Sequence, residues 1–200
     1  LIMPQGITNI STGIFVWCTY LRELDLSPSS NTLRSIGCGM PGSDGWAQSI
    51  GTFTSTRIRN LIIPKSVTDL THFLLYSSNI ENFIFLHDGN SNWPTTYLRT
   101  FRGLPLGATD DVVDARAWPK NCLVFVEQDF YNKRPTGQWW WNNDSQQYTR
   151  EFVNRLKVFD KDWGKEAWQT FNDTYHWGEE LINKVRAQFG QTNYIEILEK

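Results

Sequence analysis

Apolar residues recur along this chain in a pattern that repeats, and proline holds a fixed place within it. Residues 3–10 read Met-Pro-Gln-Gly-Ile-Thr-Asn-Ile, and residues 63–70 read Ile-Pro-Lys-Ser-Val-Thr-Asp-Leu. In both segments an apolar residue precedes proline, and further apolar residues follow three and six positions after it. Such similarity between distant segments is typical of proteins built from stacked repeats of about 20–50 residues.

Short segments of the chain alternate apolar residues in the way that β-strands with one buried face do. The alternating pairs are Leu24 with Leu26, Leu61 with Ile63, and Phe83 with Phe85. Ile62 and Ile84, on the opposite face, are apolar too, so we expect that face not to be uniformly polar. A unit of this size buries its apolar side only by stacking on its neighbours, which predicts a parallel sheet with a continuous core.

These units resemble the leucine-rich repeats of the BspA-like family, whose pattern places isoleucine, phenylalanine, cysteine and leucine at fixed intervals before a proline. The matching residues are Ile10, Ile14, Phe15, Cys18, Leu21, Leu24, Leu26, Pro28, Leu33 and Ile36. The interval from Leu61 to Phe83 also falls within the roughly 20–29 residues expected of leucine-rich repeats. The chain departs from the pattern at Pro28, which is displaced by one position, and in the segment 37–57.

The resemblance implies an α/β solenoid of irregular leucine-rich repeats with short parallel strands, closed by C-terminal helices. We therefore divide the chain into two parts. Residues 1–126 form the solenoid, with an insert at 37–57 and an irregular stretch at 87–121, and residues 127–200 form a C-terminal cap and helical segment. Cys18 falls on the family's cysteine position, which points inward, so we expect a packed thiol. The chain opens on what resembles the end of a strand, so we also expect upstream repeats of the same parent chain to pack against it.

The last third of the chain carries one further strand pattern and two helical patterns. The apolar run at residues 122–126 predicts a buried strand. Residues 146–159 and 165–189 each place apolar residues on one side of a helix, and Gly190 marks the end of the second. A long amphipathic helix here either caps the end of the stack or docks onto a partner chain. We favour the cap, because an exposed core edge promotes aggregation.

Composition removes several classes of function. A formal net charge of −2 gives no long-range field for a nucleic acid or an anionic membrane. No apolar stretch approaches the roughly 18 residues of a membrane span. The three cysteines lack the spacing of a disulfide framework or a zinc site.

The polar motifs predict neither a metal site nor a catalytic one. Residues 88–92 resemble the start of a calcium loop, but Trp93 and Arg99 stand where an EF-hand needs glycine and glutamate, so we interpret the segment as a turn. The cluster Asp110, Asp111 and Asp114 is interpreted as solvated, and the three histidines lack ligand spacing. Without a nucleophile–base pair or a phosphate loop, we expect no enzyme activity and no cofactor.

Tryptophan supplies the candidate binding residues. Trp139, Trp140 and Trp141 are consecutive, so their side chains cannot all point one way, and at least one should lie near the surface. Flat rings beside Asn143 suit sugar rings, and tryptophan is also enriched in protein interfaces. The alternative is a cap buried against the C-terminal helices. Trp46, in the insert, presents the same choice between an exposed anchor and a packed side chain.

The sequence therefore favours a non-catalytic ligand-binding or adhesion module whose solenoid surface meets a protein or a glycan. The resemblance implies a location at the cell surface or outside the cell, since BspA-like proteins are commonly adhesion proteins. The alternative is a structural or docking domain of a larger assembly, such as a phage tail or fibre, which would place the chain in a virion. Both rest on analogy of fold.

Overall fold

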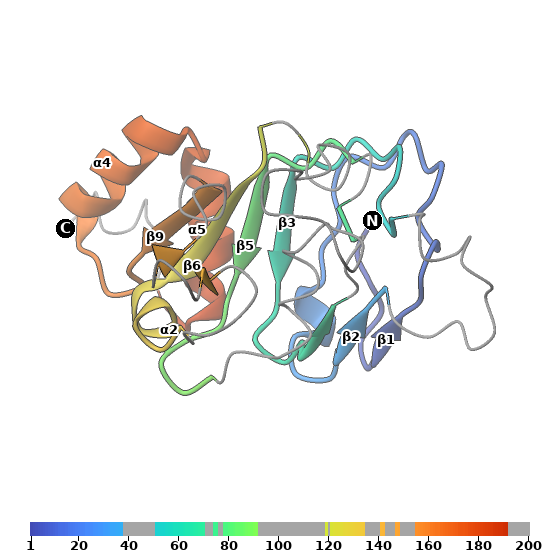
Figure 1. Cartoon of the computed structure of the whole chain (residues 1–200), viewed down its shortest axis with the longest axis horizontal. Helices are drawn as coiled ribbons and strands as arrows, with labels where there is room; N and C mark the ends of the chain where they lie inside the picture. Colours follow the sequence, from blue (N-terminus) through green and yellow to red (C-terminus); the bar gives the residue numbers. More distant parts are fainter. Residues whose placement is uncertain are drawn as a thin grey trace.

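The chain forms a mixed α/β structure with short parallel strands in two sheets and helices near its C-terminus (Figure 1). The computed structural model describes residues 1–37, 51–70, 74–75, 78–91, 119, 121–134, 141–142, 147–148 and 155–191. Within these residues, no helix is both long enough and apolar enough to cross a membrane.

The larger sheet contains four parallel strands in the order β3-β5-β6-β9. They are β3 (Asn60–Ile63), β5 (Asn82–Phe85), β6 (Leu123–Glu127) and β9 (Leu156–Phe159). Leu61 pairs with Phe83, Phe83 with Val124, and Val124 with Leu156. The predicted alternation is confirmed for the first two strands, and the predicted strand at 122–126 is β6, displaced by one residue. The side-chain amide of Asn82 donates to that of Asn60 at 2.7 Å, across an interval of 22 residues.

The smaller sheet contains three parallel strands in the order β1-β2-β4. They are β1 (Asn9–Ile10), β2 (Ser35–Ile36) and β4 (Asp69–Leu70). Ile10 pairs with Ile36 and Ile36 with Leu70, so the two segments with matching sequence patterns occupy equivalent positions. The short 3₁₀ helix η1 (Ser27–Ser29) precedes β2 and carries Pro28 at its second position. Here proline's missing N–H costs nothing, because the first N–H groups of a helix have no partner inside it.

The main core lies between these two sheets. Leu61, Ile63, Phe83 and Phe85 face it from the larger sheet, and all of them are fully buried. From the smaller sheet it receives Ile10, Ile36 and Leu70. Each apolar residue is covered by its equivalents in the neighbouring strands, which is how stacked strands bury their apolar faces.

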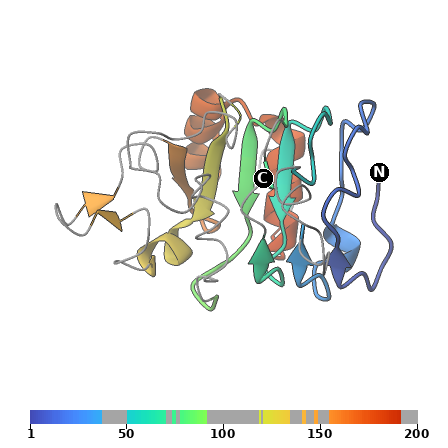
Figure 2. The ribbon, with the colours of Figure 1, turned by 45° about the vertical axis from the view of Figure 1, so that its right-hand side comes forward.

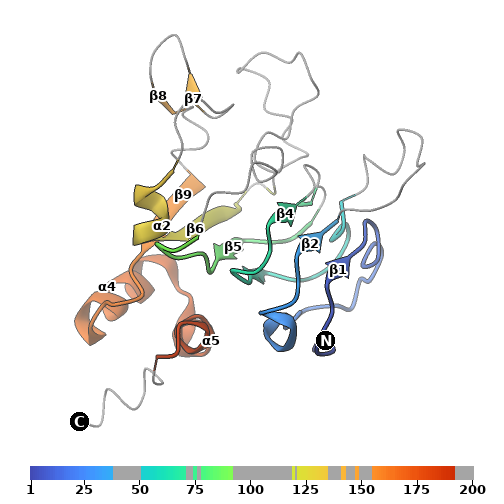
Figure 3. The same ribbon diagram turned by 90° about the horizontal axis from the view of Figure 1, so that it is seen from below.

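A second core lies on the opposite face of the larger sheet, where α4 (Lys165–Tyr175) and α5 (Gly178–Gln188) pack (Figure 3). It contains Ile84, Phe125 and Phe159 from the strands and, from the helices and their link, Trp168, Phe171, Trp177, Ile182 and Val185. The expectation that this face is not uniformly polar is confirmed. We expected the helices to cap the end of the stack or to dock onto a partner chain, but they cover a face of the sheet.

The predicted helix at 146–159 is wrong. β8 (Gln147–Tyr148) pairs antiparallel with β7 (Trp141–Asn142), and β9 lies beside β6. Leu156 and Val158 face the main core, whereas Phe159 faces the second one. Without β9, the N–H and C=O groups on that edge of β6 would lack ladder partners, and satisfying them outweighs the helical spacing of the apolar residues.

The predicted single helix over 165–189 is broken into two. His176 adopts a left-handed conformation with φ of 54°, and Gly178 has φ of 74°. The side chain of Asn172 accepts a hydrogen bond from the Gly178 N–H at 2.8 Å, which closes the link. The break lets Trp177 turn into the second core, and α5 ends shortly before Gly190 as predicted.

Two further expectations near the N-terminus are corrected. The predicted strand at 24–26 is reduced to a single parallel bridge between Asp25 and Ile2, although Leu24 and Leu26 are buried as expected. Cys18 is exposed rather than packed. Trp17 has φ of 65°, and this left-handed residue lies in a run of turns that leaves Phe15 buried and Cys18 facing outward.

Candidate functional site

A groove of about 860 Å³ runs between α5 and the N-terminal part of the chain, on the face of the larger sheet that also carries the helices. One wall is formed by residues 22–27, the second by residues 57–64, and α5 forms the third side. Figure 2 shows the red helix α5 behind the strands β3 and β5. The groove therefore occupies the part of the sheet face that α4 and α5 leave open.

The groove exists because the strands separate at this point. The Arg57 N–H donates to the Leu21 carbonyl at 2.8 Å, which holds the two walls together at one end. Farther along, Asp25 bonds instead to Leu1 and Met3, on its other side. Among the described residues, no backbone hydrogen bond joins residues 24–27 to β3.

The edge of β3 that faces the groove carries free backbone groups. The Arg59 carbonyl accepts from the N–H of Asn82 in β5, and the Ile63 carbonyl accepts from the N–H of Leu86, just after β5. Successive residues of a strand direct their backbone groups to opposite sides. The N–H and C=O groups of Asn60 and Ile62 therefore point toward the groove.

The interior of the groove is apolar. Ile62, Leu86 and Leu181 line it together with Trp177. The Trp177 ring stacks edge-on against Phe125 with centroids 4.8 Å apart, so the second core fixes its position. Its indole N–H has no hydrogen-bond partner among the described residues, which leaves a polar group buried beside the groove.

Charged side chains form the rim. Arg59 pairs with Glu81 at 2.6 Å, and on α5 Lys184 pairs with Glu180 at 2.7 Å. The hydrogen bond to Glu180 raises the pKa of Lys184, and the nearby carboxylates Glu23 and Asp25 add to that effect. The acidic residues of the rim thus lie near Lys184.

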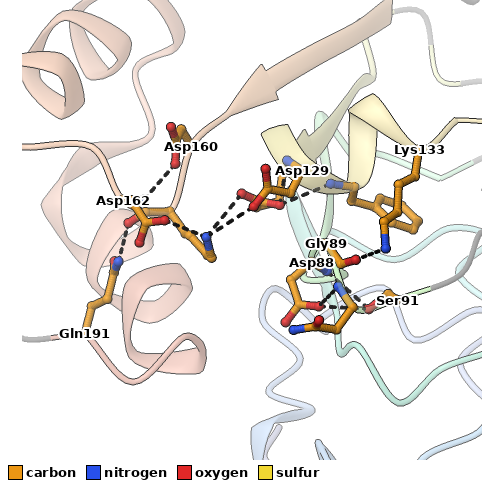
Figure 4. Close-up of polar contacts among 12 residues, drawn as sticks. Asp88, Gly89, Ser91, Asp129, Lys133, Asp160, Asp162 and Gln191 are labelled. Atoms are coloured by element: carbon orange, nitrogen blue, oxygen red, sulfur yellow. Dashed lines mark hydrogen bonds and ion pairs between the residues drawn. The ribbon is translucent and has the colours of Figure 1, made fainter.

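A second constellation lies where β5, β6 and β9 end. Ligands commonly bind outside the carboxyl ends of parallel strands. Figure 4 shows Asp88, Asp129, Asp160 and Asp162 grouped at this edge. The ammonium group of Lys161 lies 2.6 Å from Asp162 and 3.6 Å from Asp129. A shallow hollow of about 460 Å³ adjoins them.

Glu127 is the buried member of this cluster. One of its carboxylate oxygens accepts the N–H groups of Asp129 and Phe130 at 2.9 and 3.2 Å and so caps the helix α2 (Gln128–Asn132). Burial raises the pKa of Glu127, whereas these hydrogen bonds and Lys161 oppose the rise. Lys161 already supplies the positive charge, and no group of three metal-ligating side chains occurs in the described ranges. Within the described residues, the cluster joins the ends of neighbouring strands.

Four of the five binding residues proposed from the sequence lie outside the described residues. They are Trp46, Trp139, Trp140 and Asn143. Trp141 is in β7 and pairs with Tyr148 of β8. A glycan or protein contact at these residues stays a prediction.

Several polar motifs of the sequence lie within the described residues. Asp88 accepts hydrogen bonds from the Asn90 N–H at 2.8 Å and from Ser91, so the segment forms the predicted turn. His87 is buried and bonds to the Val67 carbonyl, and burial lowers its pKa to about 4. His176 is exposed at the end of α4. His72, Asp110, Asp111 and Asp114 lie outside the described residues.

Sequence reasoning missed the groove. Its arginines stand just before two of the segments with strand-like alternation, and Ile62 is the apolar residue on the outer face. These signals do not show that α5 lies opposite them, because that packing joins residues more than a hundred positions apart.

Comparison of the chain with protein-family models, curated proteins and solved structures finds no match.

Proposed function

We propose that the chain is part of a leucine-rich-repeat solenoid and works as a non-catalytic binding module whose groove holds a segment of a protein partner. The solenoid is supported by strands that stack in register at repeated sequence positions. The family resemblance favours a module exposed at the cell surface.

The groove carries this proposal. It combines an apolar interior with a charged rim, which is the composition of sites that recognise other molecules. α4 and α5 cover the outer face over β5, β6 and β9, so, among the residues that the structure describes, the groove is the part of that face left for a partner (Figure 3). Its free backbone groups suit a polypeptide better than a sugar, because a polypeptide offers matching donors and acceptors at regular spacing.

A specific observation also favours the alternative, a structural domain of a larger assembly. The turns at residues 13–20 expose Ile14, Trp17 and Tyr20, with Trp17 73% and Tyr20 87% accessible. Aromatic residues exposed together are typical of protein interfaces. A subunit of a fibre or tail would use such a patch against its neighbour.

A random peptide library displayed on phage tests the binding module. Ala187 is exposed on α5 and lines the groove, so Ala187→Tyr obstructs it without entering the core. The matched control is Thr174→Tyr, at an exposed position of α4 away from the groove. We expect peptides selected on the unmodified chain to lose binding to Ala187→Tyr and to keep it with Thr174→Tyr. Failure to select any peptide, or equal binding to both variants, overturns the proposal.

A further inference from the structure

We propose that the groove takes an acidic, extended segment of a protein partner, which adds its main chain to the free edge of β3. This inference rests on the proposed function and specifies the chemistry of the partner.

The backbone argues for an extended segment. Asn60 and Ile62 present N–H and C=O groups toward the groove, and no described residue pairs with them. On the opposite wall, Asp25 bonds away from the groove to Leu1 and Met3, so the backbone groups of Leu24 face the groove, whereas the Leu26 carbonyl already accepts the Ser29 N–H. A strand laid along β3 would pair with the free groups of Asn60 and Ile62. A helix would not, because its backbone groups bond internally.

Side-chain placement fits the same geometry. Residues of an added strand point alternately to the two faces of the sheet. One set would meet Trp177 and Leu181 on the helix side, where Ile62 of β3 already points. The other set would meet Leu24 and Leu26, which pack into the main core. The central residues of the bound segment are therefore expected to be apolar.

Charge at one end of the groove argues for acidic residues. Arg22, Arg57 and Arg59 all lie at the amino-terminal ends of the two walls. The hydrogen bond from the Arg57 N–H to Leu21 brings Arg57 next to Arg22 in the fold. Arg59 pairs with Glu81, whereas Arg22 and Arg57 make no ion pair with any described residue. Two unpaired guanidinium groups at a groove mouth complement carboxylates and fix the register of a bound segment.

Synthetic peptides test the charge requirement. The probe is an acetylated and amidated peptide of alternating valine and threonine with two glutamates at one end, made in both orientations. The comparison peptides carry lysine in place of glutamate. By fluorescence polarisation, we expect one glutamate peptide to bind at least about tenfold more tightly than its lysine counterpart. The double variant Arg22→Ala with Arg57→Ala should abolish this preference. The matched control is Arg34→Ala, at an exposed arginine outside the groove.

Amide hydrogen exchange tests the strand addition. On binding the glutamate peptide, exchange should slow at Asn60 and Ile62, whose N–H groups face the groove, more than at Leu61, which already bonds to β5. The backbone nitrogens of the bound peptide fall into two alternating sets, and one set would face β3. Methylating the nitrogens of that set should abolish binding, because their N–H groups would be lost.

The outcomes separate this inference from the proposed function. Equal binding of glutamate and lysine peptides, or unchanged exchange at Asn60 and Ile62, overturns the inference. If peptides from the library bind the unmodified chain but not Ala187→Tyr, the proposed function stands, and the groove binds a different class of segment. If no library peptide binds there, both proposals fail.

Discussion

The ammonium group of Lys161 lies 3.8 Å from the fully buried Oε1 of Glu127. Glu127 is the last residue of β6, and Lys161 follows β9 by two residues, so the pair joins the ends of two neighbouring strands. The other oxygen of Glu127 caps α2, and Oε1 itself has no hydrogen-bond partner among the described residues. This single ion pair thus compensates for the burial of a carboxylate at the sheet edge.

We expect Glu127 to make folding stability depend on pH in one direction. Burial raises its pKa, so the folded chain holds the proton more tightly than the unfolded chain. The stabilisation is fully present below the ordinary glutamate pKa and is lost as the pH rises through the raised value. Glu127→Gln keeps the shape and cannot ionise. In urea unfolding, the stability of the unmodified chain relative to Glu127→Gln should fall as the pH rises above the ordinary glutamate pKa. A difference that does not change with pH would contradict the assignment.

Removing the positive charge of Lys161 should strengthen the dependence of folding stability on pH. In Lys161→Met, the carboxylate of Glu127 loses its ion pair, so its pKa should rise further. We expect a clear loss of stability at neutral pH and a smaller loss near pH 4, where the carboxyl group takes up its proton. Lys157→Met, in the neighbouring strand β9, is the control and should show the same loss at both pH values. Unfolding curves at the two pH values measure the difference.

The left-handed link between α4 and α5 predicts that alanine destabilises the chain more at Gly178 than at Gly164. Gly178 has φ of 74°, and a Cβ there would meet no atom within 4 Å. Gly178→Ala should therefore cost about 1–2 kcal/mol from backbone conformation alone. Gly164 has φ of −71° at the N-cap of α4, also with open space around it. Gly164→Ala should change stability by less than about 0.5 kcal/mol, because weaker capping offsets the lower entropy of the unfolded chain. Equal losses in thermal unfolding would argue against the left-handed link.

Two cysteines should differ sharply in reactivity. Cys18 is exposed, whereas Cys122 is buried and its pKa is raised by burial to about 12. Because the thiolate is the nucleophile, iodoacetamide should modify Cys18 in the folded chain and spare Cys122 until urea is added. Mass spectrometry measures the modification, on a chain in which Cys38 is replaced by serine so that only Cys18 and Cys122 can react. Rapid modification of Cys122 under native conditions would mean that β6 is not buried as described.

Leu61 tests the main core. Its side chain is fully buried between the two sheets. Leu61→Ala should lower the free energy of unfolding by about 2–5 kcal/mol, because it leaves a cavity. Lys65→Ala, at an exposed position just after β3, should change stability by less than about 0.5 kcal/mol. A loss below about 1 kcal/mol at Leu61 would overturn the register of this strand.

The repeated segments could be predicted from sequence because their apolar residues serve one local purpose. Leu61 and Phe83 occupy equivalent places in neighbouring strands, as their spacing indicates. Ile10 and Leu70 likewise occupy equivalent strands of the smaller sheet, with Ile36 between them. In each case, local alternation and stacking on the next unit favour the same conformation.

The later elements could not be predicted in the same way, because distant partners decide them. Leu156 and Phe159 have helical spacing, yet the free edge of β6 draws them into a strand. Nothing local to Cys18 shows that Trp17 adopts a left-handed conformation. The groove depends on α5 meeting residues 22–27 and 57–64, a contact that no interval in the sequence encodes.

The position of β9 also bears on how the chain folds as it leaves the ribosome. β6 pairs with β5 on one side and with β9 on the other, and β9 begins at Leu156. Until that segment emerges, a nascent chain presents β6 with an open, apolar edge to the surrounding solution. Synthesis that stalls between these two strands should therefore yield products that aggregate or recruit chaperones, whereas release after α5, with that edge paired and the outer face covered, should not.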